Sequence, residues 1–462
     1  MTKDNRSLLP KWGPVFLGLA GISEWDWIPM PEIQAFRGIR YDLGHVGSLS
    51  DVIAPPYDVI SPELQASLYK KHPCNVVRLI LNRIEPGDDE VNNRYSRAKR
   101  FYQSWLAEGV LFREADPAIY VYYQEFEVDG RRYLRRGFMA RVRLSAYGEG
   151  QIFPHEHTLR GPRMDQLMLM TMCKANLSQV FGMYPDPDQQ TIAILDEAVQ
   201  GLTPIEAVDH LGVIHRMWPV TDPRLVTNLS AVVGPAPIFI ADGHHRYETA
   251  LEYREQLRDM GYLRPDHPAH YVLMHCVPME DPGLIVLPTH RLFRSIPPMT
   301  AAELAERLGD LFSLHQVANG PEAARDVWEL VEASPDPATL AIFTRPDQQW
   351  SIAELTPAGR EKMDDIATDH TPEWRALGVA VLHRLVVEHL LKLEPPLDID
   401  YVHSIEEVIL GLQTSNYPMA VLVKPASVKD IRDVSLQGDR MPAKSTYFYP
   451  KLCSGLVINP LE

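Results

Sequence analysis

The stretch from Pro237 to Ala250 reads PIFIADGHHRYETA and carries the clearest local pattern in the sequence. The apolar residues Ile238 to Ala241 fit a short buried strand, which Asp242-Gly243 then breaks. From His244 onward, apolar and small residues recur at helical spacing. The pattern therefore predicts a strand, a tight glycine turn and a helix. Such a turn directs backbone N–H groups and the positive end of the helix at one point, which favours an anion such as phosphate.

Four ionisable side chains follow the predicted strand directly: Asp242, His244, His245 and Arg246. A carboxylate, two imidazoles and a guanidinium together could hold a phosphate, a divalent metal, or both. An Asp-Gly pair before a helix also occurs as simple turn chemistry, and paired histidines are often a solvated helix start. Because all four residues come directly after an apolar strand, we favour a functional site.

Length and composition restrict the class of protein. A chain of 462 residues is too long for one ordinary core, so two or three domains are expected. With 45% hydrophobic and 23% charged residues, the balance is that of a soluble globular protein. The net charge of -16 argues against general binding of nucleic acids or anionic membranes, which requires clustered Lys and Arg.

The cysteines and the N-terminal sequence indicate a compartment. Four widely spaced cysteines without a CxxC pair are typical of buried free thiols in a reducing environment. The apolar stretch at 12–22 is shorter than the roughly 20 residues needed to span a bilayer. We therefore expect a cytoplasmic protein that does not enter the membrane.

The distribution of predicted elements gives a mixed α/β (α+β), multi-domain fold. Strands at 118–127 and 132–144, separated by Val128-Asp129-Gly130-Arg131, read as a hairpin. The expected division is an N-terminal extension at 1–30, an α/β domain at 31–145, a central domain with the ADGHHR box at 146–298, and a C-terminal α/β domain at 299–462 that completes the site with the KSTYFYPK block.

Two segments of the N-terminal part supply candidate substrate-binding residues, Asp58 and Arg78. VIAPPYDVISPE at 52–63 has two prolines that impose extended geometry, then Asp58 at a turn or ligand contact and a helix start at Ser61. NVVRLIL at 75–81 reads as a buried strand. Arg78 within it would need an anionic partner, either a protein carboxylate or a bound phosphate.

A second polar group lies at 153–184, where His155-Glu156-His157-Thr158 follow a short apolar strand. Glu156 suits a general base or a metal carboxylate. His155 and His157 resemble a metal pair, although His-x-His alone is weak evidence. A basic loop follows, and then a helix with a Met and Leu stripe that is typical of core packing. A polar pair comes before the next strand. The candidate phosphate-binding residues in this stretch are Arg160, Arg163, Asn176 and Ser178.

Two later segments repeat the polar pattern. His290 and Arg291, two further candidate substrate-binding residues, follow a strand at 284–287, so three strand ends are each followed by a cluster that contains histidine. In α/β proteins, sites assemble at strand ends. The block MPAKSTYFYPKLCSGLVI at 441–458 offers cations and hydroxyls for a second anion-binding loop, although its aromatic residues could simply anchor this segment. Its candidates are Lys444, Ser445, Thr446 and Lys451.

The motifs together carry a family resemblance. APPYDVI, PHE-T, an ANxSxxFG-like segment, ADGHHRYETA, LPTHR and MPxKSTYFYPKL are spread from Val52 to Leu452. On these motifs the chain resembles, over nearly its whole length, an uncharacterised prokaryotic family, the domain of unknown function one thousand and fifteen. It departs from the family pattern at His157, where Lys is expected, so a role that needs Lys there is not implied.

The ADGHHR box is also similar to a box of the ParB and sulfiredoxin superfamily, in particular to the Asp-Gly-His form of free serine kinases. This resemblance implies a ParB/sulfiredoxin-like central unit that binds nucleotide or phosphate. It also implies that Gly243, His244, His245 and Arg246 contact phosphates, with Glu156 or Asp242 as base or magnesium ligand.

The leading hypothesis is a phosphoryl-transfer enzyme for a small metabolite, a serine-like kinase or a phosphatase, with Mg2+ and ATP or ADP. Its catalytic residues would be Glu156, Asp242 and His244, because phosphoryl transfer depends on positioning and charge neutralisation. The expected partners are a small-molecule substrate and a nucleotide, and a homodimer is the assembly considered.

Two alternatives remain open. The first is a hydrolase that depends on a transition metal, with ligands from His155, His157, Asp242, His244 and His245. The second is a non-catalytic switch that binds nucleotide and regulates a partner.

Overall fold

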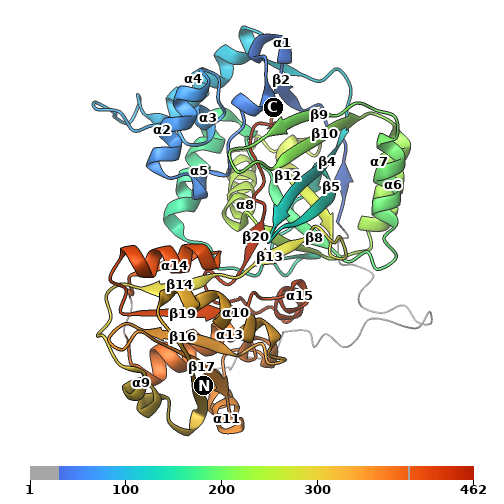
Figure 1. The fold of residues 1–462 in the computed structure, drawn as a ribbon. Helices are drawn as coiled ribbons and strands as arrows, with labels where there is room; N and C mark the ends of the chain where they lie inside the picture. The colour runs from blue at the N-terminus through green and yellow to red at the C-terminus, as the bar shows by residue number, and fades with distance from the viewer. Residues whose placement is uncertain (1–30, 394–395) are drawn as a thin grey trace, which may run out of the picture.

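The computed structural model describes residues 31–393 and 396–462, so the expected extension at 1–30 lies outside the described residues. Two large β-sheets, each with helices packed on it, lie one above the other in Figure 1. The mixed α/β class predicted from the sequence is confirmed.

Within the described residues, the first sheet has nine strands. Its order is β6-β11-β8-β12-β5-β4-β10-β9, with β1 added beside β5. Most neighbours are antiparallel, whereas β6 runs parallel to β11 and β8 runs parallel to β12. The bounds are β1 Ile33–Gln34, β4 Ile119–Val128, β5 Arg131–Arg143, β6 Ile152–Phe153, β8 Val180–Tyr184, β9 Ile205–Val208, β10 Ile214–Val220, β11 Ile238–Asp242 and β12 Tyr271–Pro278.

The predicted hairpin forms β4 and β5, joined at Asp129 and Gly130, which both have positive φ. Two consecutive positive φ angles match the twist of a two-residue hairpin, and Gly adopts them without steric cost. Alternate residues of β4 face opposite sides, as strand geometry requires. Val121 faces one core and Tyr122 faces the other.

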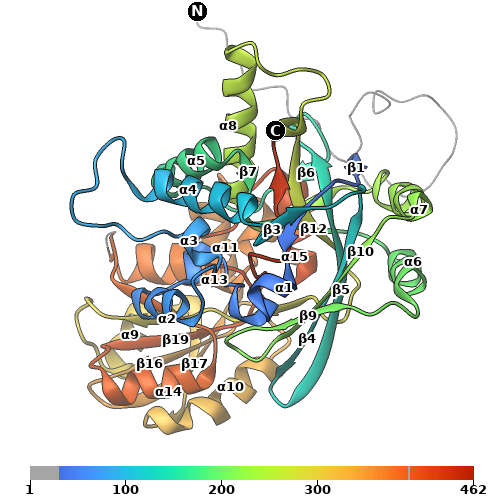
Figure 2. The same ribbon diagram turned by 90° about the horizontal axis from the view of Figure 1, so that it is seen from above.

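Helices cover both faces of this sheet (Figure 2). The face with Val121 packs on α6, α7 and α8, whereas the face with Tyr122 belongs to the core that also contains α2, α3 and α4. The bounds are α1 Leu43–Val46, α2 Pro62–Lys71, α3 Val77–Ile80, α4 Arg94–Ala107, α5 Arg160–Cys173, α6 Gln190–Val199, α7 Pro223–Val233 and α8 His244–Asp259.

The second sheet is antiparallel, with six strands among the described residues in the order β15-β17-β16-β19-β14-β18. Its strands are β14 His290–Phe293, β15 Phe312–Asn319, β16 Leu340–Thr344, β17 Gln349–Leu355, β18 Ile399–Val402 and β19 Met419–Val423. Its helices are α9 Ala301–Leu308, α10 Ala324–Ala333, α11 Pro357–Ile366, α12 Pro372–Arg375, α13 Gly378–Ala380, the π-helix η7 Val381–Leu390, α14 Ile405–Thr414 and α15 Val428–Leu436.

The segment at 441–460 connects the two sheets. Its strand β20 (Tyr447–Tyr449) pairs with β13 (Ile285–Leu287) between them, and the chain then crosses to the first sheet, as the dark red trace in Figure 1 shows. There β21 (Asn459–Pro460) pairs with β7 (Ala175–Asn176). A further ribbon joins β2 (Ile39–Tyr41) to β3 (Leu111–Arg113).

The sheets cross the expected domain boundaries. Strands from 31–145 and from 146–298 are hydrogen-bonded in the first sheet, so a boundary between residues 145 and 146 does not separate two units. The boundary near 298 follows β14, which already belongs to the second sheet. The local pattern could not reveal these pairings because they join strands far apart in the chain.

The strand predicted at 75–81 is wrong. The predicted strand is instead the short helix α3, where the Asn75 side chain accepts the N–H of Val77, the first helical residue, and donates to the Asp51 and Ile53 carbonyls. Local side-chain bonds of this kind compete with strand pairing.

One helix boundary also differs from the prediction. The expected basic loop before Asp165 is the first turn of α5, which starts at Arg160.

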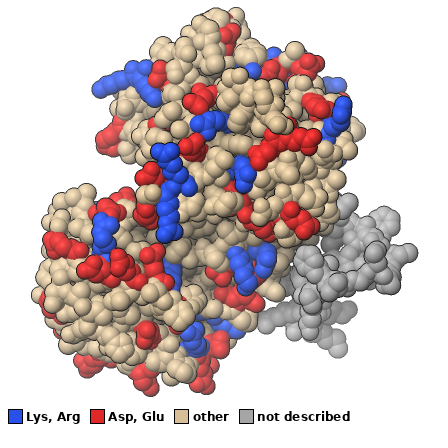
Figure 3. All heavy atoms as spheres, turned by 45° about the vertical axis from the view of Figure 1, so that its right-hand side comes forward, with Lys and Arg blue, Asp and Glu red and all other residues tan. Residues whose placement is uncertain are grey.

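Charged side chains of both signs are interspersed on the face drawn in Figure 3, without a broad basic area there. In the part of the chain that the structure describes, no helix combines the length and apolar character needed to cross a membrane.

Candidate functional site

The ADGHHR box forms the predicted strand, turn and helix, in β11, Gly243 and α8. Gly243 has φ +89°, and a Cβ atom there would lie 2.9 Å from the Arg246 guanidinium. Only glycine fits this conformation and this close approach. The N-cap residue of α8 is Gly243, which has no side chain to cap the first turn, and the positive end of the helix dipole lies at this turn.

The parallel pairing of β6 with β11 explains why two distant motifs meet. Phe153 at the end of β6 is in register with Phe239, so both strands end at the same edge of the sheet. His155 and His244, which follow these strands, have ring centroids 4.6 Å apart. The expectation that these strand ends assemble one site is consistent with this geometry.

Asp242 lies between two cations. Its Oδ2 accepts a hydrogen bond from Arg246 Nη2 at 2.7 Å, and its Oδ1 accepts one from Lys451 Nζ at 2.6 Å. Burial alone would raise the pKa of Asp242, but Lys451 and Arg246 outweigh it and hold the pKa well below its usual range. Asp242 is therefore an ionised anchor and not a base.

The guanidinium of Arg246 lies beside Gly243, the residue before α8, and is bonded to other groups of the protein. It donates to the Gln179 carbonyl at the start of β8 and to Asp242, and the residue is 6% exposed. Arg246 therefore stabilises the turn at Gly243 through contacts within the protein. This role differs from the direct phosphate contact implied by the family resemblance.

His155 and His244 are buried and neutral. His155 Nδ1 donates to the Ile240 carbonyl at 2.8 Å, and its Nε2 faces Thr446 Oγ1 at 3.0 Å. The backbone N–H of His155 donates to His244 Nε2 at 3.2 Å, so the His244 proton is on Nδ1. Burial lowers the pKa of His155 to about 4, and burial together with His155 lowers that of His244.

Glu156 is the carboxylate of this group that keeps accessible oxygen atoms. Its Oε2 lies 3.5 Å from His244 Nδ1 and its Oε1 lies 3.5 Å from Thr446 Oγ1, while 35% of the side chain is exposed. The surrounding protein, followed by the charge of Asp242, raises the pKa of Glu156, although Lys451 and Lys444 oppose this. A partly exposed carboxylate with a raised pKa suits proton transfer near neutral pH.

The KSTYFYPK block completes the group from the second sheet. Thr446 contacts His155, and Lys451 contacts Asp242 while its Nζ lies 4.7 Å from the centre of the Tyr447 ring. Lys444 is exposed and close enough to Glu156 to lower its pKa. Ser445 donates its hydroxyl hydrogen to the Pro442 carbonyl and so shapes the loop itself.

Arg291 positions this loop instead of binding substrate directly. It is 1% exposed, and its guanidinium donates to the carbonyl oxygens of Thr289 and, at 2.8 Å, of Lys444. His290, from the same motif, is buried against the Trp328 ring and faces the Val423 N–H, away from Glu156. The third predicted strand end therefore contributes support and not a reacting side chain.

Asp58 approaches the site from the N-terminal part. It is exposed on the 3-10 turn η3 (Tyr57–Val59) and lies close enough to influence the pKa values of Lys451 and His245. The side chain of His245 is half-buried, and its Nε2 accepts the Leu159 N–H at 2.9 Å. Asp58 thus keeps a position from which it can contact a ligand at the start of α8.

Other candidates are engaged elsewhere. Arg78 donates to the Tyr69 carbonyl and stacks on the Tyr69 ring, 4.2 Å from its centre, and within the described residues no carboxylate forms an ion pair with it. Asn176 accepts hydrogen bonds from Leu273 and Asn459. The hydroxyl of Ser178 lies 2.6 Å from that of Ser454. These contacts join segments of the fold.

The basic residues of α5 are also separate from Glu156. Arg163 pairs with Glu248 and Glu252 on α8, at 3.2 and 3.3 Å. Arg160 and His157 are exposed. Neither Arg163 and Arg160 on α5 nor His157 before it has a hydrogen bond to the Asp242 or Glu156 side chain within 31–393 and 396–462.

The proposed metal ligands do not form an open metal site. Both oxygens of Asp242 are bonded to cations, and both ring nitrogens of His155 have hydrogen-bond partners. Across the described ranges, no three ligand atoms from the ADGHHR and PHEHT motifs lie within 4.8 Å of one another. The geometry therefore gives no support to a hydrolase metal at these motifs.

Three neighbouring residues were not predicted. Tyr57 lies beside Asp58, and burial followed by Asp58 raises its pKa, with Arg246 and Asp242 close enough to contribute. Arg440 influences the pKa values of both buried histidines. Arg135 is fully buried and donates to the Tyr449 and Pro450 carbonyls. Tyr57 and Arg440 adjoin motifs recognised in the sequence, whereas Arg135 had no local signal.

A small pocket of about 20 Å³ is lined in part by Arg246. Apart from Arg246, Ser178, Asn176 and Gln166, its lining is apolar, and Glu156, Asp242 and His244 do not border it. We therefore identify the candidate site by its convergent polar groups and not by this pocket.

Comparison with known proteins gives one strong match. A family described as "Protein of unknown function (DUF1015)" matches residues 33–380. No curated protein matches the chain.

Several solved structures are similar to the chain at low level. A free serine kinase in complex with AMP is 13% identical, with 64% of this chain and 83% of that chain covered and a TM-score of 0.31. SbnI with a C-terminal truncation from Staphylococcus aureus is 10% identical, with 67% and 84% covered and a TM-score of 0.32. A conserved hypothetical protein from Pyrococcus furiosus is 13% identical, with 65% and 90% covered and a TM-score of 0.30. Likenesses at these scores carry no argument about activity.

Proposed function

Because this chain belongs to the family of unknown function DUF1015, whose description assigns no activity, we propose its function from the site: phosphoryl transfer to or from a small hydroxylated metabolite. The observation that carries the proposal is the position of Glu156. This carboxylate has a raised pKa, lies 3.5 Å from the neutral His244, and is in the same group as the uncapped start of α8.

The proposed phosphate position is at the first turn of α8. N–H groups at a helix N-terminus bind phosphate oxygens without help from side chains. Lys444 is exposed and lowers the pKa of Glu156, so its ammonium group is close to this carboxylate. It would neutralise charge on the transferring group. Lys451 is already paired with Asp242, so we assign it to holding the turn and raising the local positive potential.

Glu156 is the proposed base. In the ionised state it would accept the proton of the attacking hydroxyl group, or of water in the reverse direction, as the O–P bond forms and the leaving oxygen departs with the electron pair. His244 Nδ1 lies 3.5 Å from Glu156 Oε2 and would orient the carboxylate. Thr446 contacts both His155 and Glu156 and would hold their side chains in fixed positions relative to each other.

We propose a nucleotide such as ATP or ADP as phosphoryl donor or acceptor, with Mg2+ bound mainly by its phosphates. Mg2+ sites of this kind use one or two protein carboxylates and several waters. Asp58 suits that role, because it is exposed and influences the pKa values of Lys451 and His245 across the site.

The test compares Glu156→Gln with the matched variant Glu252→Gln. Glu252 is on α8, is 34% exposed and pairs with Arg163, so it resembles Glu156 in exposure but lies outside the site. Wild type and both variants are melted with ATP or ADP and Mg2+, and then assayed for phosphoryl transfer to a panel of hydroxylated metabolites. Loss of a general base lowers turnover about 10²- to 10⁴-fold. We expect this loss only in Glu156→Gln, with nucleotide stabilisation retained.

Two outcomes would reject the proposal. Equal turnover in Glu156→Gln and wild type would exclude Glu156 as the base. Stabilisation by nucleotide without turnover on any metabolite would instead favour the regulatory switch.

A further inference from the structure

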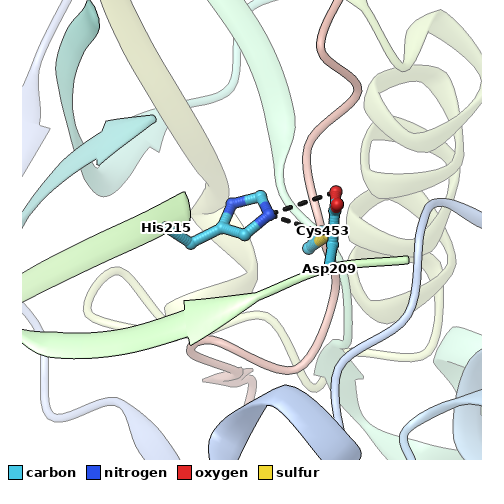
Figure 4. Close-up of side chains that lie close together, drawn as sticks. All are labelled: Asp209, His215 and Cys453. Atoms are coloured by element: carbon cyan, nitrogen blue, oxygen red, sulfur yellow. Dashed lines mark hydrogen bonds and ion pairs between the residues drawn. The ribbon is translucent and has the colours of Figure 1, made fainter. Parts of the chain in front are cut away.

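A second cluster of ligand-type side chains lies outside the candidate site. Asp209 follows β9, His215 is on β10, and Cys453 comes from the segment at 441–460 (Figure 4). His215 and Cys453 are each 1% exposed, and the Asp209 side chain is 6% exposed. Within the described residues, this is the only group of three His, Cys, Asp or Glu residues whose ligand atoms all lie within 4.8 Å of one another.

The separations between the three ligand atoms fit a tetrahedral metal ion. His215 Nε2 lies 3.2 Å from Asp209 Oδ2 and 3.6 Å from Cys453 Sγ, and Sγ lies 3.8 Å from Oδ2. Tetrahedral Zn2+, with bonds of about 2.3 Å to sulfur and about 2.0 Å to nitrogen or oxygen, places such atoms about 3.3 Å (N to O) and about 3.5 Å (S to N or O) apart.

The same three groups are hydrogen-bonded to one another, because the Cys453 thiol donates to Asp209 Oδ2 and lies within hydrogen-bond distance of His215 Nε2, but the separations are long. A charge-assisted N–H···O⁻ bond is typically about 2.7 to 2.9 Å long, which is shorter than the distance from His215 to Asp209. The geometry also differs from a Cys-His-Asp nucleophile arrangement, in which the two imidazole nitrogens contact different partners. Here Cys453 and Asp209 both face Nε2, and the thiol is buried.

The surroundings orient all three groups. Asp209 Oδ1 accepts the N–H groups of Leu211 and Val213, so Oδ2 remains directed at His215 and Cys453. The hydroxyl of Tyr122 lies 2.6 Å from His215 Nδ1. A metal-bound histidine commonly donates its second N–H to such a partner, which fixes the ring for coordination.

We infer that Asp209, His215 and Cys453 bind one Zn2+ ion, with a fourth position open to water. A thiolate, an imidazole and a carboxylate form a donor set suited to zinc and unsuited to magnesium. On binding, the S–H bond of Cys453 is replaced by an S–Zn bond, and the thiol proton passes to solvent. The ion would attach the segment at 441–460 to β10 close to Lys451, and this role does not depend on the proposed phosphoryl transfer.

The experiment uses the full chain without a histidine tag, treated with chelator and titrated with Co2+ as a spectroscopic substitute for Zn2+. We expect one Co2+ per chain, a thiolate-to-cobalt charge-transfer band, and loss of the band in Cys453→Ser. Cys276→Ser is the matched control, because Cys276 is also a buried thiol but lies on β12. Tyr122→Phe should retain the band with about 10- to 100-fold weaker binding.

Unfolding of the wild type gives an independent result if Cys453→Ser does not fold. Zn2+ should raise the unfolding midpoint of the chelator-treated chain, whereas Mg2+ alone should not. Absence of both the cobalt band and the zinc shift in wild type would overturn the inference, as would a band retained in folded Cys453→Ser. Glu156→Gln should keep the full cobalt signal, so failure of the zinc site and failure of the proposed activity are distinguishable.

Discussion

Replacement of Asp242 by Asn tests whether one buried carboxylate holds the site together. Asp242 is bonded to Arg246 and Lys451, and the three side chains are 16%, 7% and 15% exposed. The neutral amide of the Asp242→Asn variant would leave two cations close together in a largely buried place without a balancing charge. Removing one partner of a buried ion pair costs about 3 to 5 kcal/mol, because the remaining charge keeps its desolvation cost.

Thermal unfolding can measure this effect. For a domain of about 150 to 250 residues, about 1 kcal/mol corresponds to a shift of about 2 to 4 °C in Tm, so we expect Asp242→Asn to melt about 6 to 20 °C below wild type. Asp433→Asn is the control, because the Lys429–Asp433 pair on α15 is more exposed, at 73% for Lys429, and such pairs contribute about 0 to 1 kcal/mol.

The pH dependence gives a second criterion. The folded-state pKa of Asp242 is below its unfolded value of about 3.9, so its contribution is complete above that value and is lost as the pH falls through the folded pKa. The difference between wild type and Asp242→Asn should therefore be constant between about pH 5 and 8 and decrease only in stronger acid. The double variant with Lys451→Met should recover part of the loss.

Equal unfolding midpoints for Asp242→Asn and Asp433→Asn would refute the reasoning. A penalty that changed between about pH 5 and 8 would also contradict it, since another group would then titrate.

Three further predictions follow from the same region. Gly243→Ala places a Cβ 2.9 Å from the Arg246 guanidinium at φ +89° and should destabilise the chain by about 1 to 3 kcal/mol in urea unfolding, whereas Gly201→Ala, at φ +75° in open space, should cost less. Burial lowers the pKa of His155 to about 4, so its contribution to stability is complete above about pH 6.5 and is lost toward pH 4; His155→Gln should flatten this part of the stability profile. If Glu156 is the base, the acid limb of the turnover profile should lie above pH 4.5. Lys444→Met should move this limb to higher pH, because Lys444 lowers the pKa of Glu156 in the wild type. A limb that does not move would contradict an electrostatic influence of Lys444 on the base.

Local sequence predicted the parts of the fold that local interactions determine. The turn at Gly243 and the β4–β5 hairpin depend on residues next to one another, and both are confirmed. Asn75, in contrast, accepts the N–H of Val77 at the start of α3 with its side chain, and local bonds of this kind compete with the strand preference of the β-branched residues that follow it.

The candidate site could be predicted only as separate motifs. Asp242 and Lys451 are 209 positions apart, and no local pattern indicates that they form an ion pair. The parallel pairing of β6 with β11, which brings His155 to His244, is likewise a property of the sheet. Cys453 was expected to be an ordinary buried thiol. Its two neighbours in space, His215 and Asp209, are 238 and 244 positions away in the chain, so no local pattern indicated the cluster.

The route of residues 441–460 has a consequence for synthesis on the ribosome. This segment emerges after both sheets, yet it supplies Thr446 and Lys451 to the site, and Ser454 and Ile458 form bridges to Ala54 and Ile39. A nascent chain therefore exposes the start of α8 and part of the N-terminal core until translation passes residue 460. Chaperone binding to stalled chains should consequently persist until this segment has been released from the exit tunnel.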